Sequence, residues 1–127
     1  MESERSERGW ERLRELAGER GERVIEGLKD VAPDLARYVV EFGYGDVYSR
    51  PGLDLRQRQL VAISALTALG GCEPQLEYPI GIALNARLGR DEIVEAIIHC
   101  APFVGFARTL NAARSARRVF VRGGSGG

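Results

Sequence analysis

Residues 60–69 read Leu-Val-Ala-Ile-Ser-Ala-Leu-Thr-Ala-Leu, and Gly70-Gly71 follows directly. On a helix these side chains are apolar around most of the circumference, which is typical of a helix buried in a core or in a subunit interface. Asp54 lies just upstream and is a residue type that caps the first turn of a helix. The stretch therefore predicts a helix over about 55–69 that ends at the glycine pair.

Apolar residues recur at helical spacing along most of the remaining chain. This spacing predicts five further helices, over about residues 3–17, 34–42, 74–88, 91–100 and 106–121. No segment shows the sustained alternation of apolar and polar side chains that marks a half-buried strand. We therefore predict an all-α fold of about six helices.

Glycine and proline residues set the expected ends of several helices. Gly43 and Gly45 are expected to end the helix before them, because glycine destabilises a helix interior. Pro79 lacks a backbone N–H and should kink or split the helix that contains it. Pro102 and Gly105 should separate the last two helices.

Composition excludes several classes of protein. The 127 residues include 18 Lys or Arg and 18 Asp or Glu, so no net charge draws the chain to nucleic acid or to an anionic membrane. The sequence shows no apolar segment of signal-peptide type or of bilayer length, and we expect a cytoplasmic protein. Cys72 and Cys100 each lack a second cysteine at CxxC spacing and the chain has one histidine, so we expect no metal site.

Several sequence blocks occur together in a fixed order. They are Arg50-Pro-Gly-Leu-Asp54, the run from Leu60 to Leu76, Ile82-Ala-Leu-Asn85, Asp91-Glu-Ile-Val-Glu-Ala-Ile-Ile-His99, and Phe103-Val-Gly-Phe106 with Leu110-Asn-Ala-Ala113. Through these blocks, about residues 30–121 resemble the carboxymuconolactone decarboxylase family, whose fold is alkylhydroperoxidase D-like.

The resemblance implies an all-helical subunit with a central helical hairpin, assembled into homohexamers or homotrimers. It places the family domain at 30–122. The apolar stripe of Trp10, Leu13 and Leu16 predicts an N-terminal amphipathic arm at 1–29, and the Gly/Ser composition of 123–127 predicts a flexible tail. The apolar stretch at 60–69 independently favours self-association, since a 127-residue monomer has little interior in which to bury it. Two activities are typical of the family: cofactor-free decarboxylation of a carboxylated muconolactone, and reduction of peroxides.

The peroxide-reducing branch of the family uses a CxxC pair followed by a histidine. Cys72 matches the first cysteine, but Gln75 and Pro79 stand at the positions of the second cysteine and of the histidine. The chain would thus be an atypical member in which Cys72 attacks peroxide without a resolving partner. The alternative is that Cys72 is a small buried side chain, as free cysteines commonly are.

A decarboxylase must stabilise the carbanion or enolate that CO2 leaves behind, and it must then deliver a proton. His99 is the only imidazole and could act as the general acid, with Glu77 as a second candidate catalytic residue. Family members often carry a histidine where Pro79 stands here, which directs attention to His99. The alternative for His99 is a core or interface residue with a satisfied hydrogen bond.

Four polar residues are candidates for binding a substrate carboxylate or an oxyanion: Gln75, Tyr78, Asn85 and Arg50. Gln75 and Asn85 could equally join neighbouring helices, because polar groups in apolar surroundings must find hydrogen-bond partners. Arg50 could meet a carboxylate with two parallel hydrogen bonds or could be a turn residue. Arg87 stands where the family usually ends a helix with a left-handed glycine, so either arginine adopts that conformation or the helix runs longer.

We expect a cofactor-free lyase that acts on a small carboxylated, lactone-type metabolite. Two alternatives stay open: a non-catalytic oligomeric scaffold or ligand-binding protein, and a thiol-dependent peroxide reductase (peroxiredoxin activity) that uses Cys72. The expected partners are further copies of the chain and a small carboxylate, with neither nucleic acid nor membrane.

Overall fold

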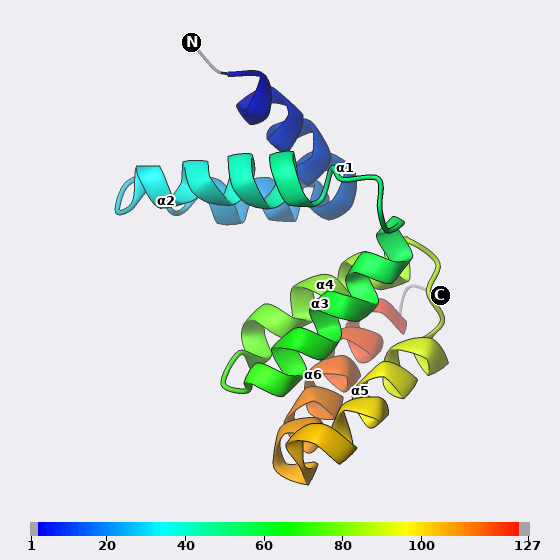
Figure 1. Cartoon of the computed structure of the whole chain (residues 1–127). Helices are drawn as coiled ribbons and strands as arrows, with labels where there is room; N and C mark the ends of the chain where they lie inside the picture. The colour runs from blue at the N-terminus through cyan, green and yellow to red at the C-terminus, as the bar shows by residue number, and fades with distance from the viewer. Residues whose placement is uncertain (1–2, 125–127) are drawn as a thin grey trace. The chain divides into compact units, whose positions relative to one another are not determined.

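The computed structural model describes residues 3–124, whose regular secondary structure is entirely helical. In chain order the helices are α1 (Glu4–Glu26), α2 (Pro33–Tyr38), the π-helix η1 (Val39–Val47), α3 (Leu55–Leu69), α4 (Glu73–Asn85), α5 (Arg90–Val104) and α6 (Phe106–Gly124) (Figure 1). The all-α prediction is confirmed. Within this described part, no helix is long and apolar enough to cross a membrane.

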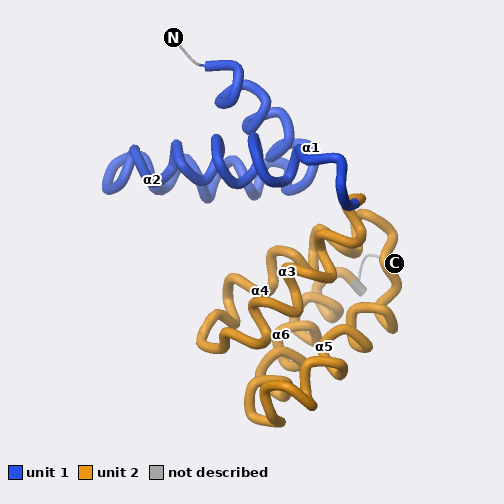
Figure 2. The backbone as a smooth tube through the Cα atoms, viewed as in Figure 1, with its two compact units in different colours: residues 1–53 blue, residues 54–127 orange. Residues whose placement is uncertain are grey.

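The chain forms two compact units, residues 1–53 and residues 54–127 (Figure 2). Unit 1 contains α1, α2 and η1, and unit 2 contains α3 to α6. The predicted family domain, residues 30–122, has other boundaries, because it was defined by sequence similarity and not by compact packing. Those boundaries stay a prediction. Of the predicted tail, Gly123 and Gly124 complete α6, and residues 125–127 lie outside the described part.

The ends of α3 are set by local signals that the sequence shows. The Asp54 carboxylate accepts a hydrogen bond from the backbone N–H of Gln57 at 2.8 Å, and the Gln57 side-chain oxygen accepts one from the N–H of Asp54 at 2.9 Å. Gly70 ends the helix, and Gly71 and Cys72 lead directly into α4. Because this connection is so short, α3 and α4 pack side by side as the predicted helical hairpin.

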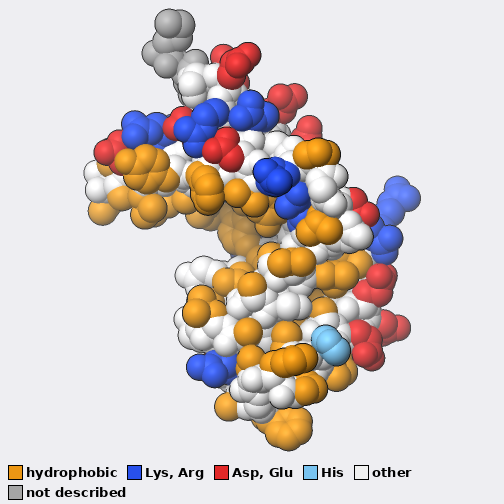
Figure 3. Space-filling view, viewed as in Figure 1, with side chains coloured by type: hydrophobic (Ala, Val, Ile, Leu, Met, Phe, Trp, Pro, Cys, Tyr) orange, Lys and Arg blue, Asp and Glu red, His pale blue; other side chains and the backbone are white. Residues whose placement is uncertain are grey.

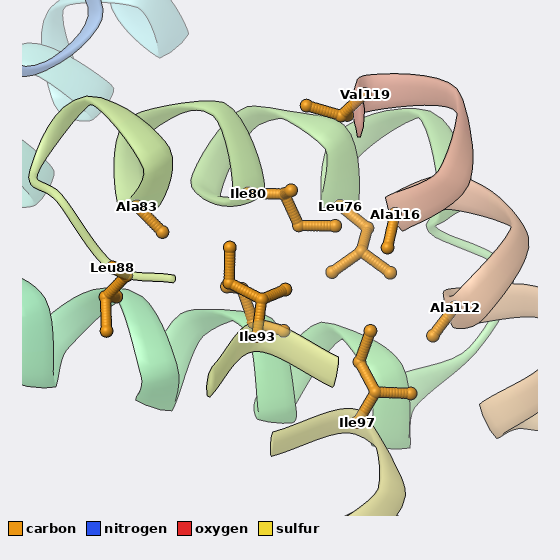
Figure 4. Close-up of a cluster of buried hydrophobic side chains, with 10 residues drawn as sticks. Leu76, Ile80, Ala83, Leu88, Ile93, Ile97, Ala112, Ala116 and Val119 are labelled. Atoms are coloured by element: carbon orange, nitrogen blue, oxygen red, sulfur yellow. The ribbon is translucent and has the colours of Figure 1, made fainter. Parts of the chain in front are cut away.

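Helices α3 to α6 pack around one apolar core in unit 2. Ile63 of α3, Ile80 of α4 and Ile93 of α5 are fully buried in it. Figure 4 shows side chains of α4, α5 and α6 pointing toward one another, with the small Ala112 and Ala116 on α6. Each large aliphatic side chain buried in this way contributes about 2 kcal/mol, so this core holds the four helices together.

Helix α3 is buried on one face only. Gln59, Ile63 and Thr67 follow one another at four-residue intervals and are fully buried, whereas Val61 and Leu69 are 58% and 65% exposed. From the sequence, a helix this apolar could be buried either in a core or in a subunit interface. The core of unit 2 accounts for one stripe of α3 and leaves another apolar stripe on the surface.

Two prolines lie inside helices that they were expected to divide. α4 runs through the buried Pro79 without a break, so the split considered from the sequence does not occur. α4 packs against α3 and α6, and this packing keeps it as one helix despite the missing N–H. α5 likewise runs past Pro102 and ends at Gly105, where φ is 85°, so the predicted end near Cys100 is wrong. Pro102 lies in the last turn, where it interrupts little of the helix.

Glycine lets α1 and η1 of unit 1 meet backbone to backbone. A Cβ on Gly9 would lie 2.1 Å from the carbonyl oxygen of Val40, and a Cβ on Gly45 would lie 2.7 Å from that of Arg5. The helix continues through Gly43 and Gly45 as η1, so the prediction that these glycines end it is wrong. Gly45 serves the close approach of two helices rather than a helix end.

Arg87 has left-handed backbone, with φ of 68°, just beyond the end of α4. The N–H of Leu88 donates to the carbonyl oxygen of Ala83 at 2.9 Å, and the N–H of Arg87 donates to that of Leu84 at 3.0 Å. This pair of hydrogen bonds is the one that closes a helix with a left-handed residue. Of the two alternatives for Arg87, the structure therefore adopts the first, in which arginine takes a conformation that suits glycine.

Glu77 joins α4 to α6 through a double ion pair. Its carboxylate accepts hydrogen bonds from Arg118 Nε at 3.0 Å and from Arg122 Nη2, and only 12% of its side chain is exposed. Burial alone would raise the pKa of this carboxyl, but the hydrogen bonds and charges of the two arginines outweigh it and lower the pKa below its ordinary value of 4.5. Glu77 is therefore ionised at neutral pH.

Replacing Gly9 by alanine should destabilise unit 1 by about 2 kcal/mol, because the added methyl group forces the α1 and η1 backbones apart. Gly43→Ala is the matched control: its Cβ meets nothing within 4 Å, and it should be neutral or stabilise by up to about 1 kcal/mol. Urea unfolding followed by the fluorescence of Trp10, the only tryptophan, reports on unit 1. Equal stability of the two variants would contradict the close approach.

Arg87→Gly should raise the free energy of unfolding by about 1 kcal/mol, since glycine removes the strain of a left-handed residue. Ala86→Gly, one residue earlier at φ of −84°, should instead lower it by about 0.5 kcal/mol. Chemical unfolding followed by circular dichroism compares the two variants with the parent chain. Destabilisation by Arg87→Gly would contradict the strain at this helix end.

The ion pairs of Glu77 should make stability depend on pH. Because the pKa of Glu77 is lower in the folded than in the unfolded chain, its contribution is full above about pH 4.5 and is lost as the pH falls through the folded-state pKa. Glu77→Gln should cost about 1 kcal/mol at neutral pH and less at pH 3. Urea unfolding at both pH values tests this, with the exposed Glu95→Gln of α5 as control. A cost that is the same at both pH values would argue against the ion pairs.

Candidate functional site

A groove with a volume of about 550 Å³ lies on unit 2 between α3 and α5. Its wall is mainly aliphatic, with few polar side chains, which is typical of small-molecule sites. The lining residues are Leu60, Val61, Ser64, Ala65, Ala68, His99, Cys100, Phe103 and Val104. Those from α3 belong to faces that the core leaves partly or fully exposed, so the one-sided burial of α3 makes the groove possible.

His99 brings the only imidazole of the chain to this groove, on the exposed surface of α5 (Figure 3, pale blue). Its ring meets the ring of Phe103, one helical turn later, edge to face at a centroid distance of 5.8 Å. The contact orients the imidazole while the ring stays accessible. His99 is thus not a core residue, and histidine is the side chain that most readily gives and takes a proton near neutral pH.

Ser64 and Cys100 meet where α3 and α5 pack together, and neither is a site residue predicted from the sequence. Cys100 is 9% exposed, and its Sγ lies 3.4 Å from the carbonyl oxygen of Ala96 and 3.8 Å from that of Ser64. One signal could have identified Ser64, which is a polar side chain four residues after Leu60 on an otherwise apolar stripe. No comparable signal distinguishes Cys100 from a core residue.

The other two predicted catalytic residues lie on different surfaces of unit 2. Glu77 is held by the arginines of α6, as described above. Cys72 directly precedes α4, is half-buried, and donates from its thiol to the carbonyl oxygen of Gly70 at 3.3 Å. Arg108 lines the same narrow crevice as Cys72. Catalytic roles for Glu77 and Cys72 stay predictions.

The predicted substrate-binding residues are spread over α4 and unit 1. Gln75 and Asn85 are exposed toward the two ends of α4, and Tyr78 between them is half-buried. Arg50 is exposed in unit 1, after the end of η1. Within residues 3–124, the lining of the α3–α5 groove includes His99 and none of the other predicted residues.

The groove offers an imidazole, a hydroxyl and a thiol beside aliphatic walls. Such a set can bind a small, largely apolar molecule and exchange a proton with it. In the described part of the chain, no group of three His, Cys, Asp or Glu side chains is placed to hold a metal ion.

Comparison with known proteins relates this chain to a family. The family model described as "Carboxymuconolactone decarboxylase family" matches residues 33–118, which run from the start of α2 into α6 and include both walls of the groove. The 4-carboxymuconolactone decarboxylase of Acinetobacter baylyi (strain ATCC 33305 / BD413 / ADP1) is 34% identical over 120 residues, which cover 94% of this chain and 89% of that protein.

An uncharacterised 15.0 kDa protein of the nqo9-nqo10 intergenic region of Paracoccus denitrificans is 30% identical over 98 residues, which cover 76% of this chain and 73% of that protein. Similarity thus extends over most of this chain and most of both relatives. The chain belongs to the carboxymuconolactone decarboxylase family.

Proposed function

We propose that this protein is a cofactor-free decarboxylase that removes CO2 from a small, carboxylated lactone-type compound. The observation that carries the proposal is the similarity, along nearly the whole chain, to a protein named for the decarboxylation of 4-carboxymuconolactone. The groove beside His99 supports it, because its chemistry suits such a molecule.

The proposed reaction breaks the carbon–carbon bond to the carboxylate, and the electron pair of that bond stays on the ring carbon. Where that carbon is conjugated with the lactone carbonyl, the pair spreads onto the carbonyl oxygen as an enolate. A proton must then form a new C–H bond at the site that lost CO2 or at the conjugated carbon. Protonated His99 is the proposed donor, and its exposure lets it regain a proton from water.

The aliphatic walls of the groove would assist the same step. The reacting carboxylate carries a localised charge, whereas the departing CO2 is neutral and the enolate charge is spread over several atoms. Side chains such as Leu60, Val61 and Ala65 solvate a localised charge poorly, so they disfavour the bound acid more than the state in which the bond is breaking. The Ser64 hydroxyl is the proposed hydrogen-bond donor to the lactone carbonyl.

His99 ranks above the other predicted catalytic residues because it lines the groove. Glu77 is engaged by two arginines and is better suited to joining helices than to carrying a proton. The remaining candidates, Gln75, Tyr78, Asn85 and Arg50, do not line the groove and have no role in the proposed step.

Purified protein should release CO2 from 4-carboxymuconolactone faster than the spontaneous reaction. His99→Ala and His99→Gln should each lower kcat by about 10²-fold or more, because general acid catalysis typically contributes that much. Glu95→Gln, one helical turn before His99 on α5 and exposed, is the matched control and should keep full turnover. A coupled assay of CO2 release measures all four proteins.

The outcomes separate the activity from its assignment to His99. Absence of turnover above the spontaneous rate in the parent protein would overturn the proposed substrate. Full turnover of both His99 variants would keep the activity and overturn the proton donor, and Glu77→Gln would then be the next variant to assay.

A further inference from the structure

Helices α5 and α6 form a second groove on unit 2, and its lining shares no residue with the groove at His99. The α5–α6 groove has a volume of about 430 Å³, which is within the range of small-molecule sites. Ile98 and Leu110 line it from the two helices and are 53% and 55% exposed. Along α6 the lining runs from Phe106 to Phe120, a span of about 20 Å at the rise of an α-helix. The groove is therefore long as well as apolar.

The buried part of this lining presents hydrocarbon. Ile97 and Ala116 are almost fully buried there, and Thr109 is the buried polar residue among the lining side chains. The Thr109 hydroxyl donates to the carbonyl oxygen of Phe106 at 3.1 Å, within its own helix, so its proton is already used. A polar group placed on this surface would lose its hydrogen bonds to water without replacing them. A molecule that binds here must therefore be apolar along most of its length.

Positive charge lies at one end of the α5–α6 groove. Arg117 is the one ionisable residue among the lining residues, and it lies one helical turn before Phe120. The Arg90 guanidinium lies at the same end, 5.2 Å from the ring centroid of Phe120, and donates to the carbonyl oxygen of that residue at 3.3 Å. The groove thus combines a long apolar surface with one cationic end.

The charge of Arg117 is not compensated by a neighbouring acid. Within residues 3–124 its side chain forms no hydrogen bond or ion pair, and α6 carries five arginines and no acidic residue. On α5, Glu92 is paired with Arg56, and Asp91 and Glu95 are not part of the lining. An anionic group at this end of the groove would therefore gain an arginine that the rest of the described chain leaves available.

We propose that the α5–α6 groove binds a carboxylate that carries an unbranched hydrocarbon chain, as a medium-chain fatty acid does. The chain lies along the apolar length of the groove, and the carboxylate pairs with Arg117, whose aliphatic stem lines the groove while its guanidinium reaches the water. An extended chain matches a groove that follows α6 for about four turns, whereas a compact ring would cover only part of it. The site does not involve His99, so it stands or falls separately from the proposed decarboxylation.

Calorimetric titration of the full chain with decanoate, below the concentration at which decanoate forms micelles, tests the site. The parent protein should show saturable binding of one decanoate per chain. Decylammonium has the same chain and the opposite charge, and it should bind about tenfold more weakly or worse, because its head group meets a like charge.

Substitutions of Arg117 test the charged end of the groove. Arg117→Gln should raise the dissociation constant of decanoate by about tenfold, and Arg117→Glu should raise it further and reverse the preference between decanoate and decylammonium. Arg114→Gln removes an arginine of the same helix that is outside the lining, and it should bind decanoate like the parent. An unchanged preference in folded Arg117→Glu would overturn the role of this arginine and with it the proposal.

Substitutions by phenylalanine test which groove is used. Ala113→Phe, at an exposed lining residue, should fill the α5–α6 groove and abolish binding. Ala107→Phe on the same helix outside the lining, and Ala65→Phe in the groove at His99, should both bind decanoate like the parent. Circular dichroism must show that each variant is folded. Binding that survives Ala113→Phe or is lost in Ala65→Phe would overturn the proposal, as would a parent chain that binds no decanoate, the result expected where a second copy of the chain fills the groove.

Discussion

The burial of Ile63 constrains the whole of unit 2. This side chain of α3 shares one core with Ile80 of α4 and with Ile93 and Ile97 of α5, and the core fixes how α3 and α5 lie against each other. The separation of the groove walls therefore depends largely on side chains that do not line the groove. The exceptions are Leu60, which packs against the core, and Cys100, which lies where α3 meets α5. Because this core packs α3 against α5, most of the lining residues are available for binding and proton transfer.

The helix ends that were predicted correctly from the sequence are those set by residues within one helical turn. The predicted cap Asp54 and the glycines after α3 define the two ends of that helix without help from distant residues. The predictions that failed concern residues whose effect depends on tertiary packing. Gly45 looks like a helix end until α1 is seen to pass within contact of its Cα, and α4 tolerates Pro79 because it packs against α3 and α6.

In the candidate site, too, some residues could be identified from the sequence and others only from the packing of the helices. His99 could be identified from the sequence because it is the only imidazole, and its exposure beside a groove fits that choice. The location of Glu77 could not, since its role depends on which face of α4 meets the arginines of α6. Ser64 and Cys100 join His99 through the packing of α3 on α5, a contact between residues 36 positions apart in the chain. The spacing of residues within one helix cannot predict such a contact between two helices.

The single histidine makes the central claim directly observable, because one set of imidazole signals in a nuclear magnetic resonance spectrum belongs to His99. The claim is that a small carboxylated lactone binds in the α3–α5 groove beside this ring. Titration of the parent protein with the decarboxylated lactone product should shift the imidazole signals in a saturable manner, together with backbone signals of α3 and α5. Saturable binding that shifts signals of α4 and α6 and leaves the imidazole unchanged would contradict the account.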